Sequence, residues 1–461
     1  MSRNFVGKLL IFLLFFIGSL DTKVLSNTLS LGDGSVFEMM LTNDTTPYMK
    51  QISIAASSKA IFNVTNVSST ASFIIFQIHI YQHNVTLSFD KDCLDKVSNR
   101  SIFGSNIGLL SKLTTNIMTQ FFVKNDNVHD VKALLVVIAY NNKAPVPGGC
   151  NMEFDTEIAP YARMRTRDAM VIVDVQPASL PFNSMPWTCE KEPVEVEMYQ
   201  MYLPEQDLTA ETYFTGIVNM LTVEDIKKNG VKAMASIVSS PMRRIFSAYF
   251  GVGSVYVAVA SYGDYSAAYV PIFSYGCNPT IDPVSCDILS EGVLKFISAV
   301  CFFVGLFFTF LGHHVSRVEK MFPIFFIGTV IGYAIEGSFV ILQNNTVFWF
   351  LFLTLALGIA VVTTFCFCSY ITCSIFSSFT IILPIDYWVG SSLKYIMINI
   401  VRRATVEDFN LAIVRPPIQT KDIWLIVFWI CLALFHFYKH YQNQLLLNDR
   451  MTETTPLWNQ Y

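Results

Sequence analysis

The run VFWFLFLTLALGIAVVTTFCFCSYITCSIFSSFTIILPI (Val347–Ile385) contains no charged side chain, and it decides the architecture of this chain. One α-helix of that length would extend about 58 Å at 1.5 Å per residue. The hydrocarbon core of a bilayer is about 30 Å thick. The run therefore predicts two membrane-spanning helices, Val347–Cys368 and Tyr370–Ile385.

Three further apolar runs flank this stretch and predict a five-span bundle over residues 289–438. They are Val293–Gly312, Phe322–Leu342 and Asp422–Phe437. Charged residues are 14% of the chain, against about 25% in a typical soluble domain. The net charge of −4 gives no reason to expect nucleic acid as a partner, whereas membrane lipids are expected ones.

The first 26 residues have the layout of a secretory signal peptide. Arg3 and Lys8 precede the apolar run Leu9–Leu20, and Val24 and Ser26 are small residues before a cleavage point. An uncleaved signal anchor is the alternative. In either case the segment that follows is delivered to the lumen.

Five N-x-[ST] triplets follow within about sixty residues, and they predict a glycosylated ectodomain. They begin at Asn43, Asn63, Asn66, Asn84 and Asn99. Asn63 and Asn66 are close enough to compete for the transferase.

The ectodomain has a hydrophobic period of two, which is typical of β-strands. The period is clearest in Phe73–Phe89, which predicts one strand, buried on both faces at first and later on one; Ala133–Tyr140 and Val255–Tyr262 are similar. The best helical segment is Thr209–Leu221. The fold class predicted is an α+β membrane protein: a β-sandwich-rich luminal ectodomain followed by an α-helical transmembrane bundle.

A weak similarity between two segments of the ectodomain favours two tandem units, 27–160 and 161–288. Ile138–Cys150 and Val259–Cys277 both run from a strand through a polar turn to Gly-Cys. The boundary is expected near Pro160–Arg167, where charge interrupts the pattern. Chance similarity of two strand ends is the competing explanation.

Five cysteines lie in this luminal region, where disulfides are the default. The short Pro-containing loop between Cys277 and Cys286 makes their bridge the easiest, and a Cys93–Cys150 bridge would staple the first unit. Cys189 is then left over, either free or bonded to another chain.

With the ectodomain outside, the basic first loop, His313–Lys320, is expected in the cytosol, as the positive-inside rule requires. The odd number of spans places the tail, 439–461, in the cytosol as well. Span counting places the fourth connection, Trp388–Lys421, outside, although that connection carries five basic residues. After Ser391 and Ser392, which can cap a helix, apolar residues recur at helical spacing. This stripe is Leu393, Ile396, Met397, Ile400 and Ala404, with Asn399, Arg402 and Arg403 off it. A helix on the membrane surface and a helix packed over the bundle both fit.

No motif of an enzyme, a metal site or a cofactor site is present, so no catalytic residue is assigned. Glu336 lies inside the second span, where a carboxylate costs about 2.5–3.5 kcal/mol and marks either a transport pathway or a hydrogen-bonded partner. Cys366 and Cys368 are candidates for palmitoylation. In the tail, Glu453 and Leu457 have the spacing of an acidic dileucine sorting signal, but Trp458 occupies the second aliphatic position. Plasma-membrane residence is therefore expected to outweigh an endolysosomal pool.

The residues resemble the transmembrane 7 superfamily member 3 family over nearly the whole mature chain. The most specific segment is PVPGGCNMEFD at Pro145–Asp155, supported by YLPEQDLT, SAAYVP, VFWF and LKYIMINIVRRA. Relatives carry seven spans, whereas five are counted here.

The resemblance implies a glycosylated multi-pass surface protein that favours cell survival under protein-folding stress. A non-enzymatic protein with an unknown extracellular protein or lipid ligand and an unknown cytosolic partner is the favoured class. A small transporter or channel centred on Glu336, or an orphan receptor, is the alternative.

Overall fold

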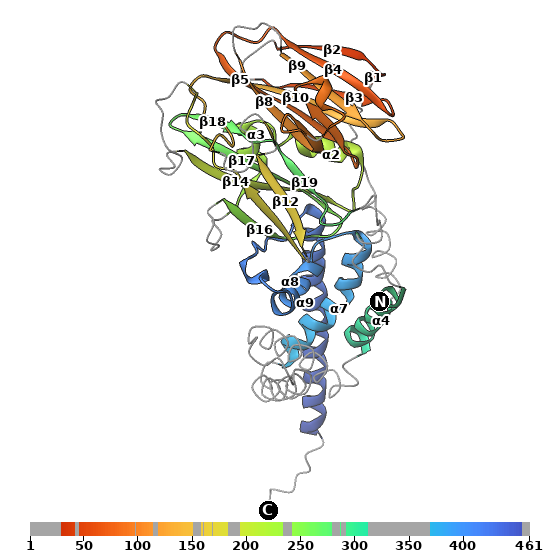
Figure 1. Cartoon of the computed structure of the whole chain (residues 1–461). Helices are drawn as coiled ribbons and strands as arrows, with labels where there is room; N and C mark the ends of the chain where they lie inside the picture. The colour runs from red at the N-terminus through yellow and green to blue at the C-terminus, as the bar shows by residue number, and fades with distance from the viewer. Residues whose placement is uncertain are drawn as a thin grey trace, which may run out of the picture.

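The computed structural model describes residues 29–41, 46–96, 98–113, 119–150, 158–159, 161–167, 169–182, 194–233, 242–278, 286, 292–311 and 369–453. Strands occupy the N-terminal part of this chain and long helices the C-terminal part (Figure 1). The α+β fold class is thereby confirmed. The β-rich region lies above the helices as two stacked units.

The first unit is a sandwich of two sheets. The larger sheet has the order β1 (Leu29–Leu31), β3 (Tyr48–Ile54), β10 (Val131–Asn141), β5 (Ala71–Ile80), β8 (Asn106–Lys112) and β11 (Ile158–Ala159). The smaller has the order β2 (Ser35–Met40), β4 (Ser58–Thr65), β9 (Thr119–Asn125), β6 (Val85–Ser88) and β7 (Ser101–Gly104). Alternate side chains of both sheets meet between them, and Phe76 stacks on Phe121 with ring centroids 4.5 Å apart.

The second unit is also built from two sheets. One has the order β12 (Ala162–Arg167), β13 (Met170–Val175) and β16 (Arg243–Ser247). The other has the order β15 (Val231–Lys232), β14 (Glu195–Glu205), β17 (Val252–Tyr262) and β18 (Tyr265–Ala268), with β19 (Ile272–Ser274) also paired to β17. Phe246 and Tyr256 fill the core between them, with ring centroids 4.7 Å apart.

The larger sheet of the first unit is buried on both faces because the second unit covers its outer side. Phe73 and Ile75 of β5 join the core of the second unit. Two helices, α2 (Ala210–Val218) and α3 (Val223–Asn229), fill the remaining space between the units. The prediction of one strand over Phe73–Phe89 is wrong. β5 and β6 belong to different sheets, because the chain turns at Gln82 and crosses the sandwich.

Three long helices are described in the C-terminal part: α4 (Gly292–Leu311), α7 (Ser369–Val389) and α9 (Thr420–Glu453). α7 packs between α4 and α9, and Gly305 lets α4 approach α7 closely, since a Cβ there would lie 2.7 Å from Thr380 Oγ1. Within the described residues one helical stretch, Thr420–Asn443, is long and apolar enough to cross a membrane. Two predicted spans, 322–342 and 347–368, lie outside the described residues. α9 continues past its predicted span, so the predicted tail begins as helix.

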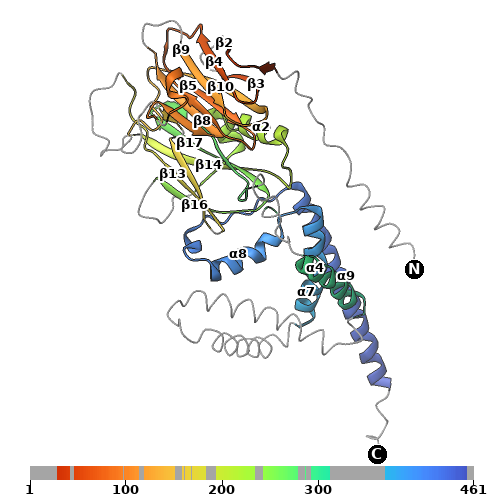
Figure 2. The ribbon, with the colours of Figure 1, turned by 45° about the vertical axis from the view of Figure 1, so that its right-hand side comes forward.

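A shorter helix, α8 (Lys394–Thr405), links α7 to α9 together with the 3-10 turn η6 (Phe409–Leu411). It lies across the direction of α9, directly beneath the second β unit (Figure 2). This placement brings the connection between α7 and α9 into contact with the second β unit.

Candidate functional site

The connection between α7 and α9 packs against the second β unit, and we call the contacts made by residues 386–422 with that unit the junction. Its backbone extends the sheet at β16. The Ile413 N–H donates to the Ile245 carbonyl at 2.8 Å, and the Ser247 N–H donates to the Ile413 carbonyl at 3.1 Å. Beside this bridge, Phe409 is buried against Met170 and Ile245. The junction is thus a sheet extension with its own apolar core.

Arg402 of α8 is buried in the second unit. Its Nη1 donates to the Ala248 carbonyl at 2.6 Å and to Ser247 Oγ at 3.3 Å. The guanidinium carbon lies 5.1 Å from the centre of the Phe250 ring, which is a cation–π distance. Burial lowers the pKa of Arg402, but a guanidinium is so basic that the side chain stays charged.

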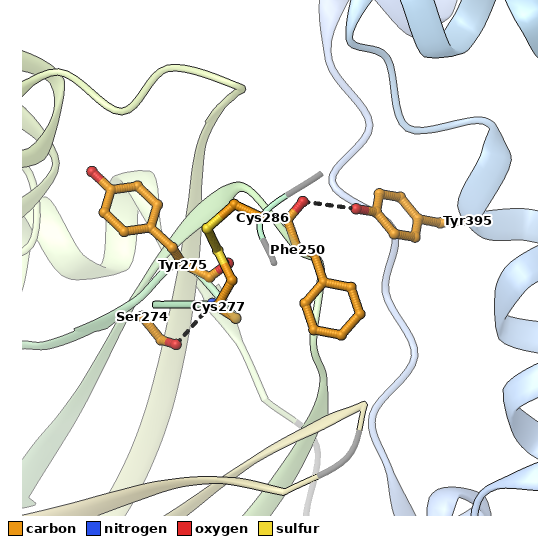
Figure 3. Close-up of a disulfide and its surroundings, with 7 residues drawn as sticks. Phe250, Ser274, Tyr275, Cys277, Cys286 and Tyr395 are labelled. Atoms are coloured by element: carbon orange, nitrogen blue, oxygen red, sulfur yellow. Dashed lines mark hydrogen bonds between the residues drawn. A yellow bond between two sulfur atoms is a disulfide. The ribbon is translucent and has the colours of Figure 1, made fainter. Parts of the chain in front are cut away.

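Tyr395 contacts the same turn of the second unit, beside a disulfide (Figure 3). Its hydroxyl donates to the Phe250 carbonyl at 3.1 Å, and its ring meets that of Tyr249 edge-on at 4.6 Å. The Cys277–Cys286 bond closes the adjacent loop, as the sequence predicts. Gly251 has φ +74°, and a Cβ there would lie 2.8 Å from the Cys286 carbonyl oxygen, so the turn requires glycine.

The orientation of α8 differs from what its apolar stripe suggests. Tyr395, Asn399 and Arg402, which lie off that stripe, are the side chains that the second unit buries. Ile396, on the stripe, is 47% exposed. The predicted alternatives considered only the membrane surface and the helical bundle as neighbours. The second unit is a further neighbour of α8, because the polar side chains of the helix find hydrogen-bond partners there.

Two buried aspartates organise the beginning of α8. Asp422, at the start of α9, accepts hydrogen bonds from Ser391 Oγ, from the N–H and Oγ of Ser392 at 2.6 and 2.9 Å, and from the Gln419 N–H at 2.5 Å. Asp386, at the end of α7, accepts from the N–H groups of Leu393 and Lys394 at 2.9 and 3.1 Å.

These contacts correct one expectation. Ser391 and Ser392 do not cap α8, because both hydroxyls donate to Asp422. Asp386 is 0% exposed, and its carboxylate satisfies the first N–H groups of α8. The helix is therefore capped from α7.

A buried ion pair joins this cluster to the ectodomain. Lys394 Nζ donates to Glu205 Oε1 at the end of β14 and to the Ser391 carbonyl at 2.5 Å, and it lies 3.8 Å from Asp386 Oδ2. Glu205 Oε2 is buried without a hydrogen-bond partner. Burial raises the pKa of Glu205 to about 7; the Lys394 ammonium opposes the rise, and the carboxylates of Asp386 and Asp422 add to it.

One sequence signal could have pointed to this cluster. The connection Trp388–Lys421 carries more basic residues than an external loop should. Two of them, Lys394 and Arg402, are buried against the second unit, so they have a structural role. Glu205 gave no such signal, because it is 181 or more residues away from its partners in the chain.

The predicted glycosylation sites differ in accessibility. Asn66, Asn84 and Asn99 are exposed. Asn63 is only 7% exposed, and its Oδ1 accepts a hydrogen bond from Gln120 Nε2 at 3.2 Å. Asn43 lies outside the described residues. The fold thus favours Asn66 in the competition between the two neighbouring triplets.

The predicted Cys93–Cys150 bridge is wrong. Cys93 carries a free thiol, whereas Cys150 is disulfide-bonded elsewhere. Cys93 follows β6 in the smaller sheet of the first unit, and Cys150 lies beyond β10, at the strands of the second unit. Spacing along the chain does not reveal this separation.

For the remaining candidates, the described residues show no arrangement that indicates a catalytic or metal-binding role. Among the described residues, no group of three His, Cys, Asp or Glu side chains could hold a metal ion. His436 is buried between helices, with Nδ1 3.1 Å from Ser374 Oγ. Glu453 ends α9. Four predicted sites lie outside the described residues. They are the intramembrane acid Glu336, the palmitoylation candidates Cys366 and Cys368, and the tail residue Leu457.

Comparison with known proteins gives three family models in the order of the structure. They are "TM7SF3-like, N-terminal immunoglobulin-like domain" over residues 41–140, "TM7SF3-like, second immunoglobulin-like domain" over residues 145–280, and "TM7S3/TM198-like domain" over residues 333–441. The chain belongs to the transmembrane 7 superfamily member 3 family. It is 26% identical over 443 residues to Transmembrane 7 superfamily member 3 of Homo sapiens, covering 80% of this chain and 77% of that protein. The protein of the same name from Rattus norvegicus is 25% identical, with 80% and 78% covered.

Membership of the transmembrane 7 superfamily member 3 family identifies both β units as immunoglobulin-like domains and the chain as a membrane protein. It gives no sign of an enzyme. The junction joins two parts that the family models treat separately, because Glu205 lies in the second immunoglobulin-like domain, and Asp386, Lys394 and Asp422 lie in the TM7S3/TM198-like domain.

Proposed function

We propose that this chain is a non-enzymatic plasma-membrane protein that limits cell death under protein-folding stress by coupling an extracellular binding event to its membrane helices. The observation that carries the proposal is the junction. Buried side chains of α8 contact β14 and the Ser247–Phe250 turn of the second domain. Asp386 of α7 and Asp422 of α9 in turn bind the residues at the start of α8. A partner that displaces the ectodomain must therefore disturb helices in the membrane.

The first immunoglobulin-like domain is the candidate partner-binding domain. The second domain lies between it and the membrane helices (Figure 1). The distal domain is therefore free to meet an extracellular protein or lipid ligand, while the proximal domain transmits the contact. A cytosolic partner would then respond to movement of α9, the helix that leads to the C-terminus.

The junction also supports a topology with the N-terminus outside and the C-terminus in the cytosol. The connection between α7 and α9 binds the ectodomain, so it belongs on the same side of the membrane. α9 then crosses to the other side. The exposed triplets at Asn66, Asn84 and Asn99 fit a glycoprotein delivered by a signal peptide.

Survival of cells under calcium-depletion stress of the endoplasmic reticulum tests the proposal. Cells that lack their own family member would receive the full chain, a Lys394→Met variant, or a Lys232→Met variant as the matched control. Lys232 pairs with Glu197 on the second domain, away from the junction. At equal surface levels we expect the full chain and the control to restore survival and Lys394→Met to fail. Equal rescue by all three proteins would remove the junction from the function.

A small transporter remains the second candidate, because polar groups are buried between the helices. His436 of α9 and Ser374 of α7 contact each other there, and ionisable residues inside a bundle commonly mark an ion pathway. Loss of an ionic flux on removing the charge of Glu336 would favour this candidate.

A further inference from the structure

The ionic cluster at the start of α8 contains more buried negative charge than positive charge. Three carboxyl groups, Glu205, Asp386 and Asp422, surround one ammonium, Lys394, and all four residues are at most 7% exposed. The other buried cation of the junction, Arg402, donates to Ala248 and Ser247 and to none of these carboxyls. If every carboxyl were ionised, the ammonium could balance only one of the three negative charges in this cluster. Burying an uncompensated charge is costly, so one carboxyl should take up a proton.

The hydrogen bonds show which carboxyl should take it. Asp422 accepts from four donors and Asp386 from two backbone N–H groups, so both oxygens of each carboxyl already have hydrogen-bond donors. Glu205 accepts from Lys394 alone, and its Oε2 is buried without any hydrogen-bond partner. A proton on Oε2 removes the charge from the one carboxyl oxygen that nothing stabilises.

Three helices bring titratable groups to Glu205. Lys394 and Tyr395 belong to α8, Asp386 to α7 and Asp422 to α9. The ammonium favours the ionised form of Glu205, whereas burial and the two aspartates favour the protonated form. Burial has the larger effect and raises the pKa of Glu205 from 4.5 to about 7.

We propose that Glu205 is a proton-binding residue that makes the ectodomain hold the membrane helices more tightly in acidic compartments than at neutral pH. This regulation rests on the coupling role proposed above. The pKa of Glu205 is higher when the junction is closed than when it is open. Between pH 4.5 and 7 the closed state therefore binds more protons than the open state. Closure is therefore favoured below pH 4.5 and loses that advantage as the pH rises through 7.

The predicted size of the effect follows from the two pKa values. The pKa of Glu205 is 4.5 in the open junction and about 7 in the closed one. The equilibrium constant for closing is therefore about tenfold larger at pH 6 than at pH 8. Endosomal sensors work over the same pH range. A chain that moves from the cell surface to an acidic compartment would thus close its junction.

Hydrogen exchange on the full chain in lipid nanodiscs tests the proposal. The readout is the protection factor of the α8 amides, which is the exchange rate relative to the intrinsic rate at each pH. In the unmodified chain we expect protection to rise about tenfold from pH 8 to pH 6. Glu205→Gln should be equally protected at both pH values, because its amide mimics the protonated acid. Glu197→Gln, on the same strand but paired with Lys232, should retain the tenfold change.

Two outcomes would overturn the proposal in distinguishable ways. A tenfold change that persists in Glu205→Gln would assign the proton to another group. A flat response in the unmodified chain would remove the pH regulation, but the coupling role would stand if Lys394→Met lowered protection at both pH values. If Lys394→Met also left protection unchanged, the coupling role itself would fail.

Discussion

Replacing Lys394 by methionine should destabilise the junction more than any other single loss of charge there. Methionine keeps much of the length of the side chain but removes the only ammonium among three buried carboxyls. Removing one partner of a buried ion pair typically costs about 3–5 kcal/mol. For a unit of this size, that corresponds to a fall in Tm of roughly 6–20 °C.

Thermal unfolding of the full chain in nanodiscs at pH 8 would measure this change. The cost should be smaller at pH 6, because Glu205 loses the ammonium that favours its ionised form and therefore protonates more readily. A Glu205→Gln change added to Lys394→Met should restore part of the lost stability, since it removes the uncompensated charge.

Lys232→Met serves as the control, because it removes a lysine that pairs with a glutamate at the surface of the same domain. Its Tm should not change measurably. A Tm for Lys394→Met within 1 °C of the unmodified chain at pH 8 would refute the reasoning, because it would mean that the three carboxyls need no cation.

Four further predictions concern other parts of the chain. Asn66→Gln should reduce the mass shift produced by glycosidase, whereas Asn63→Gln should not, because Asn63 is buried and Asn66 is exposed; an equal loss from both would contradict this. Cys286→Ser should lower the stability of the second domain by about 2–3 kcal/mol in chemical unfolding, as expected for so short a loop, and an unchanged midpoint would count against it. Glu336→Gln should be tolerated at normal surface levels without loss of ionic flux, since the amide keeps the hydrogen-bonding shape, and a selective loss of flux would favour the transporter. An epitope after Tyr461 should be stained only in permeabilised cells, and staining of intact cells would reverse the proposed topology.

The class of the protein could be predicted from the sequence because it depends on local patterns. Uncharged runs long enough to span a bilayer and period-two hydrophobicity identify a membrane bundle and a β-rich ectodomain without knowledge of any contact. The α2 helix begins after Thr209, whose Oγ1 accepts from the Thr212 N–H, as a capping residue should. The match of YLPEQDLT and PVPGGCNMEFD to the family is equally local.

The partner of each surface could not be predicted in the same way. β5 and β6 read as one strand because alternation continues through the turn at Gln82, although they lie in different sheets. The apolar stripe of α8 predicts which side avoids water, but it does not say whether the polar side meets water or protein. Asn399 and Arg402 turn out to be buried because the second domain supplies hydrogen-bond acceptors and donors for them.

The sequence by itself determined that this chain has a β-sandwich ectodomain and apolar helices, because both follow from the spacing of apolar residues along the backbone. Only the tertiary structure decided that the two parts share a buried ionic junction. Glu205 and Lys394 are 189 residues apart, and neither is unusual among its neighbours in the chain. The pKa of Glu205 depends on how deeply it is buried and on which charges the fold brings to it, and these arise from contacts that no local pattern encodes.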